Sequence, residues 1–319
     1  MDNTLHFALL EAVKKRVPEG TSIARLLMDI LHVGREAIYR RLRGEVLFSF
    51  DEAVAISTRL AISLDTVVGS NMQNSRPFML KVTNFVNPQE LDFEQLEEFT
   101  NIISDAREEL NSEMGVSANI LPQTLYIEFE HLTKFYFLKW LYQSQRIGNV
   151  KSIKEIKISD RMYDIQKRYL KESKYLKNTY YIFDNLIFTY LINDIKYYAR
   201  IHHITKDDVV ILKQELLMLI DKLETLAIRG RFDTGEKVQF YLSAINLEAT
   251  YSYLQTQSYN ISHITAFTLN AVVSLDLETF EKMKRWIESV KRLSTLISES
   301  GEMERTIFFN KQRELINSL

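Results

Sequence analysis

The first apolar pattern of the chain has the period of a helix. Leu5, Leu9 and Val13 lie four residues apart and so share one helical face. Pro18 and Gly20 follow and are expected to end this helix. A short helix with one apolar face needs neighbours that cover this face, so the pattern predicts a bundle.

A second helix is predicted from about Ile23 to Leu31, where apolar residues again recur at helical spacing. Thr21 or Ser22 can cap its amino end. The segment is too short to be stable alone, and the residues His-Val-Gly separate it from the next helical pattern. Two short helices joined by such a turn are typical of a helix-turn-helix.

The third predicted helix has a cationic outer face. Its sequence, REAIYRRLRGE, begins at Arg35 and contains four arginines. Ile38 and Leu42 lie four residues apart and share the buried face, so Arg40 and Arg43 lie roughly opposite them. The outward surface of this helix is therefore long, polar and mostly cationic.

Two more short helices are predicted before the first domain ends. Ser49 and Glu52 fit a capping box for the fourth helix, and Ser63 can cap the fifth. The stretch SNMQNSRPF then has the polar, proline-containing composition of a linker. The predicted boundaries are residues 1–69 for the first domain, 70–84 for the linker and 85–319 for the remainder.

The segments LMDILHVGREAIYRRLRGE and LAISLDTVVG together resemble the Cro/repressor-type (XRE-like) helix-turn-helix family. The resemblance covers residues 5–69 and implies a five-helix bundle whose third helix enters the major groove of DNA. In the family a turn glycine stands where this chain has His32, and here the glycine comes two places later, at Gly34. The residues that the resemblance and the helix-end chemistry assign to base edges are Arg35, Glu36, Tyr39 and Arg40, and those assigned to phosphates are Thr21, Ser22 and Arg43.

These residue types suit the reading of a duplex. The guanidinium of an arginine can bond O6 and N7 of guanine together, which contributes about 1 to 3 kcal/mol of discrimination, and Glu36 can accept from N4 of cytosine. Acidic and basic residues balance within residues 1–69, so this domain has no overall positive charge. Its basic residues are nevertheless concentrated on the third helix. Because this predicts modest affinity per monomer, a homodimer is expected to present two such helices to major grooves about 34 Å apart.

The remainder of the chain is predicted to be mostly helical. Alternating and β-branched residues predict two or three antiparallel strands between Lys237 and Val273. The predicted fold class is mainly α: an N-terminal five-helix λ-repressor-like bundle, a linker, and a large, mostly helical domain with a small antiparallel β element near 237–273. Long helical patterns are found at about 88–114, 122–145, 159–174, 179–202, 205–229, 277–297 and 302–317.

Composition narrows the chemistry. The 319 residues include no cysteine, which excludes disulfides and thiolate sites and favours the reducing cytoplasm. The six histidines show no metal-ligand spacing, and the chain has neither a phosphate-binding glycine loop nor a Gly-x-Ser-x-Gly elbow. We therefore expect no enzymatic activity, no metal and no cofactor.

The most membrane-like stretch of the chain runs from Tyr180 to Tyr198. Asp184, Asn185 and Asp194 interrupt it, and insertion of such residues into a bilayer is heavily penalised. This stretch is predicted to be a buried helix, and no membrane contact is expected.

The sequence as a whole predicts a cytoplasmic, DNA-binding transcriptional regulator. Residues 1–69 would read an operator in double-stranded DNA, while the remainder would dimerise and could sense a small-molecule or protein effector that the sequence does not identify. Two alternatives stay open. A protein–protein interaction scaffold that kept the helix-turn-helix fold would show no salt-dependent DNA binding, and an enzyme would carry a polar cleft with shifted carboxylates in the large domain.

Overall fold

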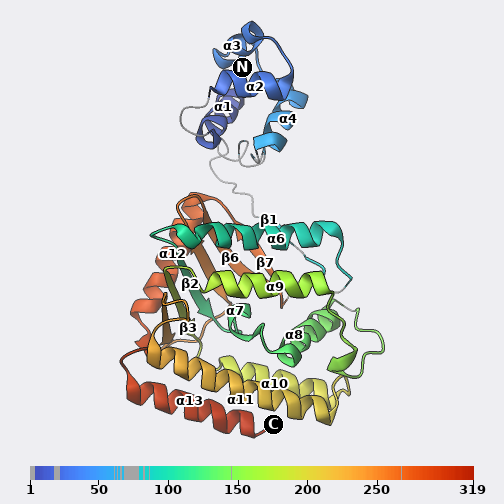
Figure 1. The fold of residues 1–319 in the computed structure, drawn as a ribbon, viewed down its shortest axis with the longest axis vertical. Helices are drawn as coiled ribbons and strands as arrows, with labels where there is room; N and C mark the ends of the chain where they lie inside the picture. Colours follow the sequence, from blue (N-terminus) through green and yellow to red (C-terminus); the bar gives the residue numbers. More distant parts are fainter. Residues whose placement is uncertain are drawn as a thin grey trace. The chain divides into compact units, whose positions relative to one another are not determined.

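The computed structural model describes residues 4–17, 22–60, 62, 64, 67, 79–81, 83–85, 87–144, 146–266 and 268–319. The chain divides into two compact units, Met1–Phe78 and Met79–Leu319. Figure 1 shows the helices and strands of each unit. The larger unit begins at Met79, within the segment 70–84 that the sequence predicts to be a linker.

The N-terminal unit is helical. Its described helices are α1 (Thr4–Arg16), α2 (Ile23–Leu31), α3 (Arg35–Leu42) and α4 (Phe50–Leu60), and they lie where the apolar periodicity predicts them. The fifth predicted helix, which would start near Ser63, lies largely outside the described residues.

One small core holds these four helices together. Val13 of α1, Leu27 of α2, Ile38 of α3 and Ile56 of α4 pack in a single cluster, and each of them is fully buried. Leu5, which the periodicity places on the inner face of α1, is 50% exposed and lies at the margin. Because each helix contributes only a few apolar side chains, no helix of this unit is stable without the others.

The larger unit contains a mixed sheet and helices on both of its faces. Its elements in chain order are β1 (Met79–Lys81), α6 (Glu90–Asp105), η1 (Ala106–Glu108), β2 (Glu113–Ala118), α7 (Gln123–Tyr126), α8 (Glu130–Gln143), η2 (Ile153–Glu155), α9 (Asp160–Ser173), β3 (Asn178–Phe183), α10 (Ile187–Arg200), α11 (Lys206–Arg229), β4 (Lys237–Leu242), β5 (Tyr251–Gln255), β6 (Asn260–Ala266), β7 (Asn270–Ser274), α12 (Leu277–Arg292), β8 (Thr295–Leu296) and α13 (Glu302–Asn317).

The described strands form one eight-stranded sheet in the order β1-β7-β6-β5-β2-β3-β4-β8. β2, β3 and β4 are parallel, and all other neighbours are antiparallel. The helices between the parallel strands are the crossovers that parallel pairing requires. The sheet is thus an α/β centre extended by an antiparallel meander.

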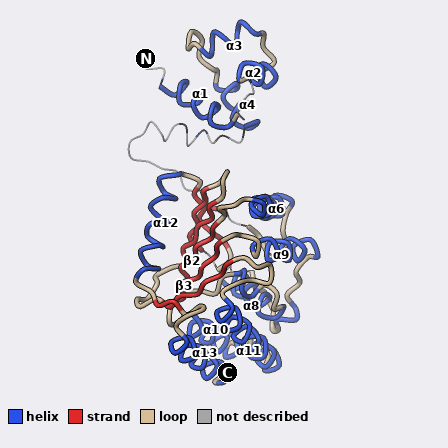
Figure 2. The backbone as a smooth tube through the Cα atoms, turned by 60° about the vertical axis from the view of Figure 1, so that its left-hand side comes forward, coloured by secondary structure: helices blue, strands red, loops and turns tan. Residues whose placement is uncertain are grey.

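The two faces of the sheet are covered unequally. Figure 2 shows α12 on one side of the strands and α6, α8 and α9 on the other, while α10, α11 and α13 lie below the strands. On the α12 side, Phe280 and Ile287 pack with Tyr180 and Tyr253 of the sheet in a small cluster. The main core of this unit lies against the opposite face, and every other described helix of the unit contributes to it.

The predicted fold class is wrong for the larger unit. Instead of a mostly helical domain with a small antiparallel β element near 237–273, the unit is built on a sheet that begins at β1. β4 lies within the predicted antiparallel element but pairs in parallel with β3. The predicted helix at 179–202 is in fact β3 followed by α10, and the predicted helix at 88–114 ends at Asp105 as α6, so that β2 begins at Glu113.

The burial of β3 explains why the sequence misleads here. Thr179, Tyr181 and Phe183 face the main core, while Tyr180 and Ile182 face α12. A parallel strand buried on both faces gives a continuous apolar run, which has no alternation and cannot be told from a buried helix by its period.

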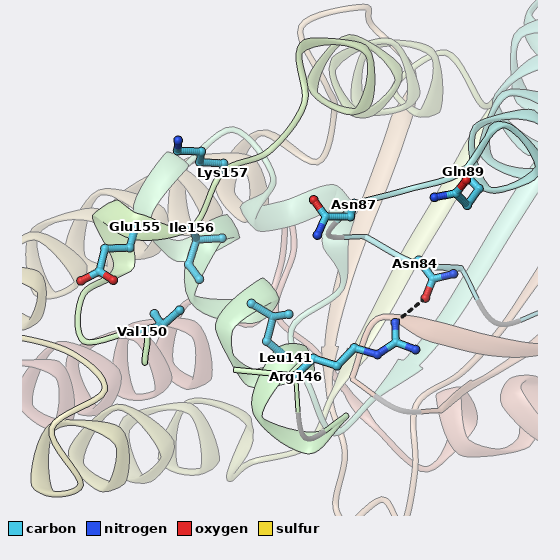
Figure 3. A pocket seen from close by; sticks show the side chains of 9 residues that line it. All are labelled: Asn84, Asn87, Gln89, Leu141, Arg146, Val150, Glu155, Ile156 and Lys157. Atoms are coloured by element: carbon cyan, nitrogen blue, oxygen red, sulfur yellow. Dashed lines mark hydrogen bonds between the residues drawn. The ribbon is translucent and has the colours of Figure 1, made fainter. Parts of the chain in front are cut away.

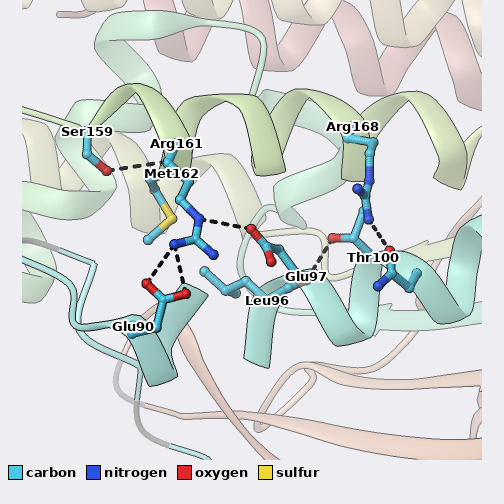
Figure 4. A network of polar contacts seen from close by, with 9 residues as sticks. Glu90, Leu96, Glu97, Thr100, Ser159, Arg161, Met162 and Arg168 are labelled. Atoms are coloured by element: carbon cyan, nitrogen blue, oxygen red, sulfur yellow. Dashed lines mark hydrogen bonds and ion pairs between the residues drawn. The ribbon is translucent and has the colours of Figure 1, made fainter. Parts of the chain in front are cut away.

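Two helices on the main-core side are tied by one arginine. Arg161 of α9 donates from Nε to Glu97 at 3.0 Å and from Nη1 to Glu90 at 2.8 Å, and both acceptors lie on α6 (Figure 4). Its guanidinium also lies 4.4 Å from the centre of the Phe93 ring. This arginine therefore fixes the amino end of α9 against the first turns of α6.

In the described part of the chain, no helix is both long enough and apolar enough to cross a membrane.

Candidate nucleic-acid interface

A three-residue turn joins α2 to α3. His32 ends α2 with φ 54°, in the left-handed region, and its N–H donates to the carbonyl of Met28. Gly34 precedes α3 with φ −68°, which any residue can adopt. The position that needs a left-handed backbone is thus the one where the resemblance places the family's glycine, although this chain has a histidine there.

The outward face of α3 carries all four candidate base-reading residues. Arg35, Glu36, Tyr39 and Arg40 are exposed, and Tyr39 has 38% of its surface exposed. Ile38, which lies on the other side of the helix, is fully buried. The structure therefore brings these four side chains together on one accessible helical face, as the periodicity predicts.

One arginine of α3 serves the fold instead. Arg41 donates from Nε to Oε2 of Glu52 at 3.1 Å and from Nη2 to Oε1 at 2.6 Å. Glu52 also accepts the N–H of Ser49, and its own N–H donates to the Ser49 hydroxyl. The predicted capping box is confirmed, and its carboxylate additionally clamps α3 to the amino end of α4.

The environment of Glu52 favours its charged form. Burial alone would raise the pKa of this carboxyl group, but the hydrogen bonds from Arg41 and from the Ser49 N–H outweigh burial and lower the pKa below its ordinary value. Glu52 is therefore a charged structural residue at neutral pH.

A second carboxylate lies beside the candidate interface. Arg43, the C-cap of α3, donates from Nε to Glu45 at 2.6 Å and from Nη2 at 3.1 Å. Arg40 Nε lies 3.6 Å from the same carboxylate. The hydrogen bond from Arg43 lowers the pKa of Glu45, so this carboxylate is charged and would compete with phosphates for both arginines.

Arg35 lies over an aromatic ring. Its guanidinium carbon is 5.5 Å from the centre of the Tyr39 ring, one helical turn further along α3. Such a cation–π contact orders an arginine without consuming its hydrogen-bond donors. Arg35 is thus oriented, yet its donor groups stay available.

His6 of α1 anchors the carboxyl end of α3. Its Nδ1 accepts the N–H of Phe48 at 3.2 Å, so the proton must be on Nε2, which donates to the carbonyl of Arg41 at 2.8 Å. The ring is buried, with 7% of its surface exposed. Because His6 bonds the backbone at both ends of the loop after α3, it fixes the axis of this helix relative to α1.

Of the three candidate phosphate contacts, two lie within the described residues. Ser22 is the N-cap of α2, and its exposed hydroxyl accepts the N–H of Arg25 at 3.4 Å. Arg43 is exposed but paired with Glu45, as stated above. Thr21 lies outside the described residues.

Sequence reasoning missed Arg41 and Glu45. Helical spacing places Arg41 between the inner and outer faces, and no local signal indicates that Glu52 would reach it from the next helix. Glu45 lies beyond the end of α3, where the helical period no longer says which way a side chain points. Only the three-dimensional path of the loop shows either pair.

Other chemistry is sparse in the described part of the chain. No group of three or more His, Asp or Glu side chains is placed there to hold a metal ion. In comparisons with known proteins, no family model, no curated protein and no solved structure matches this chain. The function must therefore be argued from the geometry of α3 and its surroundings.

Proposed function

We propose that the N-terminal unit binds double-stranded DNA in a sequence-dependent manner, and that the protein acts as a transcriptional regulator in the cytoplasm. One observation carries this proposal: Arg35, Glu36, Tyr39 and Arg40 share a single exposed face of a helix that its neighbours hold rigidly. A rigid helix with such a face has the shape and the chemistry to enter a major groove.

Each residue has a distinct task in this proposal. Arg35 and Arg40 bond O6 and N7 of guanine with their planar forks, and Glu36 accepts from N4 of cytosine. Ser22 and the free N–H groups at the amino end of α2 contact a phosphate. Arg43 contacts a phosphate once it leaves Glu45, so this ion pair opposes sequence-independent binding.

A homodimer completes the proposal. One α3 helix offers only a few base contacts, whereas two copies related by a two-fold axis would read two half-sites about 34 Å apart. The larger unit is the proposed site of dimerisation.

The test is selection of bound fragments from a random duplex pool with the full-length protein. An enriched palindromic sequence made of two half-sites is expected. Arg40→Ala should then weaken binding to that sequence by about 1 to 3 kcal/mol, while binding to unrelated DNA changes much less. Arg40→Lys keeps the charge and loses the fork, so it should lose discrimination between sequences while keeping its salt dependence. Equal binding of every duplex by the parent, Arg40→Ala and Arg35→Ala would refute the proposal.

A second function is favoured by a separate observation. Three apolar residues of the loop before α4 and of α4 itself are exposed: Leu47 at 50%, Phe50 at 77% and Val54 at 38%. Exposed apolar side chains of this kind are typical of protein interfaces. Under this alternative, in which the unit is a protein–protein interaction scaffold, the selection would enrich no sequence, and Phe50→Ser would abolish a partner contact that Arg40→Ala leaves intact.

A further inference from the structure

The larger unit carries a groove with a volume of about 450 Å³, a size that accommodates a small organic molecule. One wall is the segment between β1 and α6, and the other is formed by the residues that follow α8 and precede α9. Figure 3 shows the side chains that line it. The groove belongs entirely to this unit and has no part in the candidate interface on α3.

The floor of the groove is apolar. Leu141 and Ile156 line it and are buried, with 6% and 3% of their surfaces exposed, and the half-buried Val150 lies beside them. Figure 3 shows Leu141 and Ile156 pointing toward each other across the floor. The free energy of the system falls when another apolar group covers these side chains and removes them from water.

The segment after α8 presents an arginine, Arg146, for which the described residues supply no carboxylate partner. Nη1 of Arg146 donates to Oδ1 of Asn84 at 2.9 Å (Figure 3). Asn84 is in turn held by Asp92, which accepts its N–H at 2.9 Å. Among the described residues no carboxylate lies within ion-pair distance of the Arg146 guanidinium. A neutral amide therefore positions this arginine. The guanidinium keeps its full positive charge, and its other N–H groups can donate to an anion.

Asn87 adds a neutral polar group from the wall between β1 and α6. Its backbone has φ 56°, a left-handed conformation that asparagine tolerates better than most residues. In Figure 3 its amide points toward the floor, between Arg146 and Ile156. The groove thus combines an apolar floor with the guanidinium of Arg146 and the amide of Asn87, while the charged side chains of Glu155 and Lys157 line its other end (Figure 3).

The wall is also rigid before any ligand arrives. Asp92 accepts the N–H of Gln89 at 2.8 Å as part of the capping box of α6. Glu90, the next residue, is bound by Arg161 of α9, which links the two walls (Figure 4). These ties hold the backbone on both sides of Asn87 in place, so less conformational entropy is lost when a ligand binds.

From this arrangement we infer that the groove binds a small carboxylic acid with an apolar tail: the carboxylate bonds Arg146 and the amide of Asn87, and the tail covers Leu141, Val150 and Ile156. The site goes beyond the proposed DNA binding and does not depend on it. It gives the larger unit a ligand-binding function of its own.

The test is isothermal titration calorimetry on the full-length protein without DNA. The probes are hexanoate and octanoate, and the neutral counterpart hexanamide has nearly the same shape as hexanoate. Hexanoate should bind at least about tenfold more tightly than hexanamide, since a charge-assisted hydrogen bond is lost in the amide. Octanoate should bind more tightly than hexanoate, because two further methylene groups are buried.

Variants locate the site. Arg146→Gln should remove the preference for hexanoate over hexanamide, and Asn87→Gly, which keeps the left-handed backbone, should weaken hexanoate binding several-fold. Arg200→Gln removes one exposed positive charge from the end of α10 and should leave binding unchanged. Absence of binding by both acids at millimolar concentration would overturn the inference, as would equal binding of hexanoate and hexanamide or unchanged binding to Arg146→Gln. Because no DNA is present, none of these outcomes bears on the proposed function.

Discussion

Arg41 and Glu52 form a two-pronged ion pair between α3 and α4, with N···O distances of 3.1 Å and 2.6 Å. The two side chains are 16% and 18% exposed, so the pair is largely shielded from water. A further hydrogen bond from Arg41 to the carbonyl of Ala37 fixes the guanidinium along α3. One arginine of the cationic helix is therefore part of the structure that holds α3 against α4.

Loss of Arg41 should destabilise the N-terminal unit. Arg41→Ala leaves the Glu52 carboxylate half-buried with its main partner gone, which should lower the free energy of unfolding of this unit by about 2 kcal/mol. Arg43→Ala removes an arginine from the exposed pair with Glu45 and should destabilise the unit much less, because water screens that pair. Hydrogen exchange of the α3 and α4 amides in the full-length protein measures both. Equal costs for the two variants would contradict this account.

The same pair should make the unit sensitive to acid. The pKa of Glu52 lies below its ordinary value of 4.5 in the folded state, so the unfolded state takes up a proton first as the pH falls. The stabilisation is complete above that ordinary value and is lost as the pH falls from there through the lowered pKa. The difference in stability between the parent and Glu52→Gln should therefore shrink as the pH falls below about 4.5. Glu45→Gln, at an exposed pair, should show a much smaller change, because water screens that pair; a difference of the same size would show that Glu52 is not the responsible group.

The candidate interface could be predicted in outline from sequence. Ile38 and Leu42 lie four residues apart and so define the inner face, which places Arg40 on the outer one, and the structure agrees for each. The roles of Arg41 and Glu45 could not be predicted in this way. Each depends on how a loop returns the chain to α3, and helical periodicity carries no information on a loop's path.

The turn before α3 offers a stabilising substitution. His32 holds φ 54°, where a side chain is strained and glycine is not. His32→Gly should raise the free energy of unfolding of the N-terminal unit by about 0.5 to 1 kcal/mol, measured by hydrogen exchange of the α2 and α3 amides. Gly34→Ser is the control: its φ is −68°, nothing lies within 4 Å of an added Cβ, and a serine N-cap should change stability by only a few tenths of a kcal/mol, approximately. Destabilisation by His32→Gly would refute the strain.

The fold of the larger unit was harder to predict, for a physical reason. Most of its helices carry caps and long periodic patterns, as at Thr205 and Asp208, which form a capping box at the start of α11. Its central strands lack such signals. β2 has the sequence EMGVSA, with few of the residues that favour strands, and it is stable only because two neighbouring strands bond it on both sides. The local sequence of a strand does not indicate which distant strands it pairs with.

Gly115 of β2 shows how close these strands and side chains come. A Cβ at this position would lie 2.5 Å from the Tyr253 ring and 2.6 Å from the Tyr180 ring. Those rings are each 1% exposed, and their hydroxyls bond each other at 3.0 Å, so neither ring can move without cost. Gly115→Ala should lower the free energy of unfolding of the larger unit by about 3 kcal/mol in denaturant titration.

Ser117 provides the matched control on the same strand and the same face. Its buried hydroxyl has no hydrogen-bond partner among the described residues. Ser117→Ala therefore removes an unsatisfied polar group and should be neutral or slightly stabilising. A loss of stability in Ser117→Ala as large as that in Gly115→Ala would mean that this strand tolerates no change at all, and the close approach of the two tyrosines would explain nothing.

Under the proposed function, Glu45 should lower the affinity of the protein for DNA. Its carboxylate lies 2.6 Å from Arg43 Nε and 3.6 Å from Arg40 Nε, so both arginines must give up this partner before they contact a duplex. Glu45→Gln should raise the affinity for any duplex and steepen its salt dependence, because each added phosphate contact increases the slope of log K against log salt by about 0.9. Fluorescence anisotropy at several salt concentrations measures both quantities. Glu11→Gln removes the same charge from an exposed site on α1, and if it raised affinity equally, the effect would be one of net charge and the pairing with Arg40 and Arg43 would play no part.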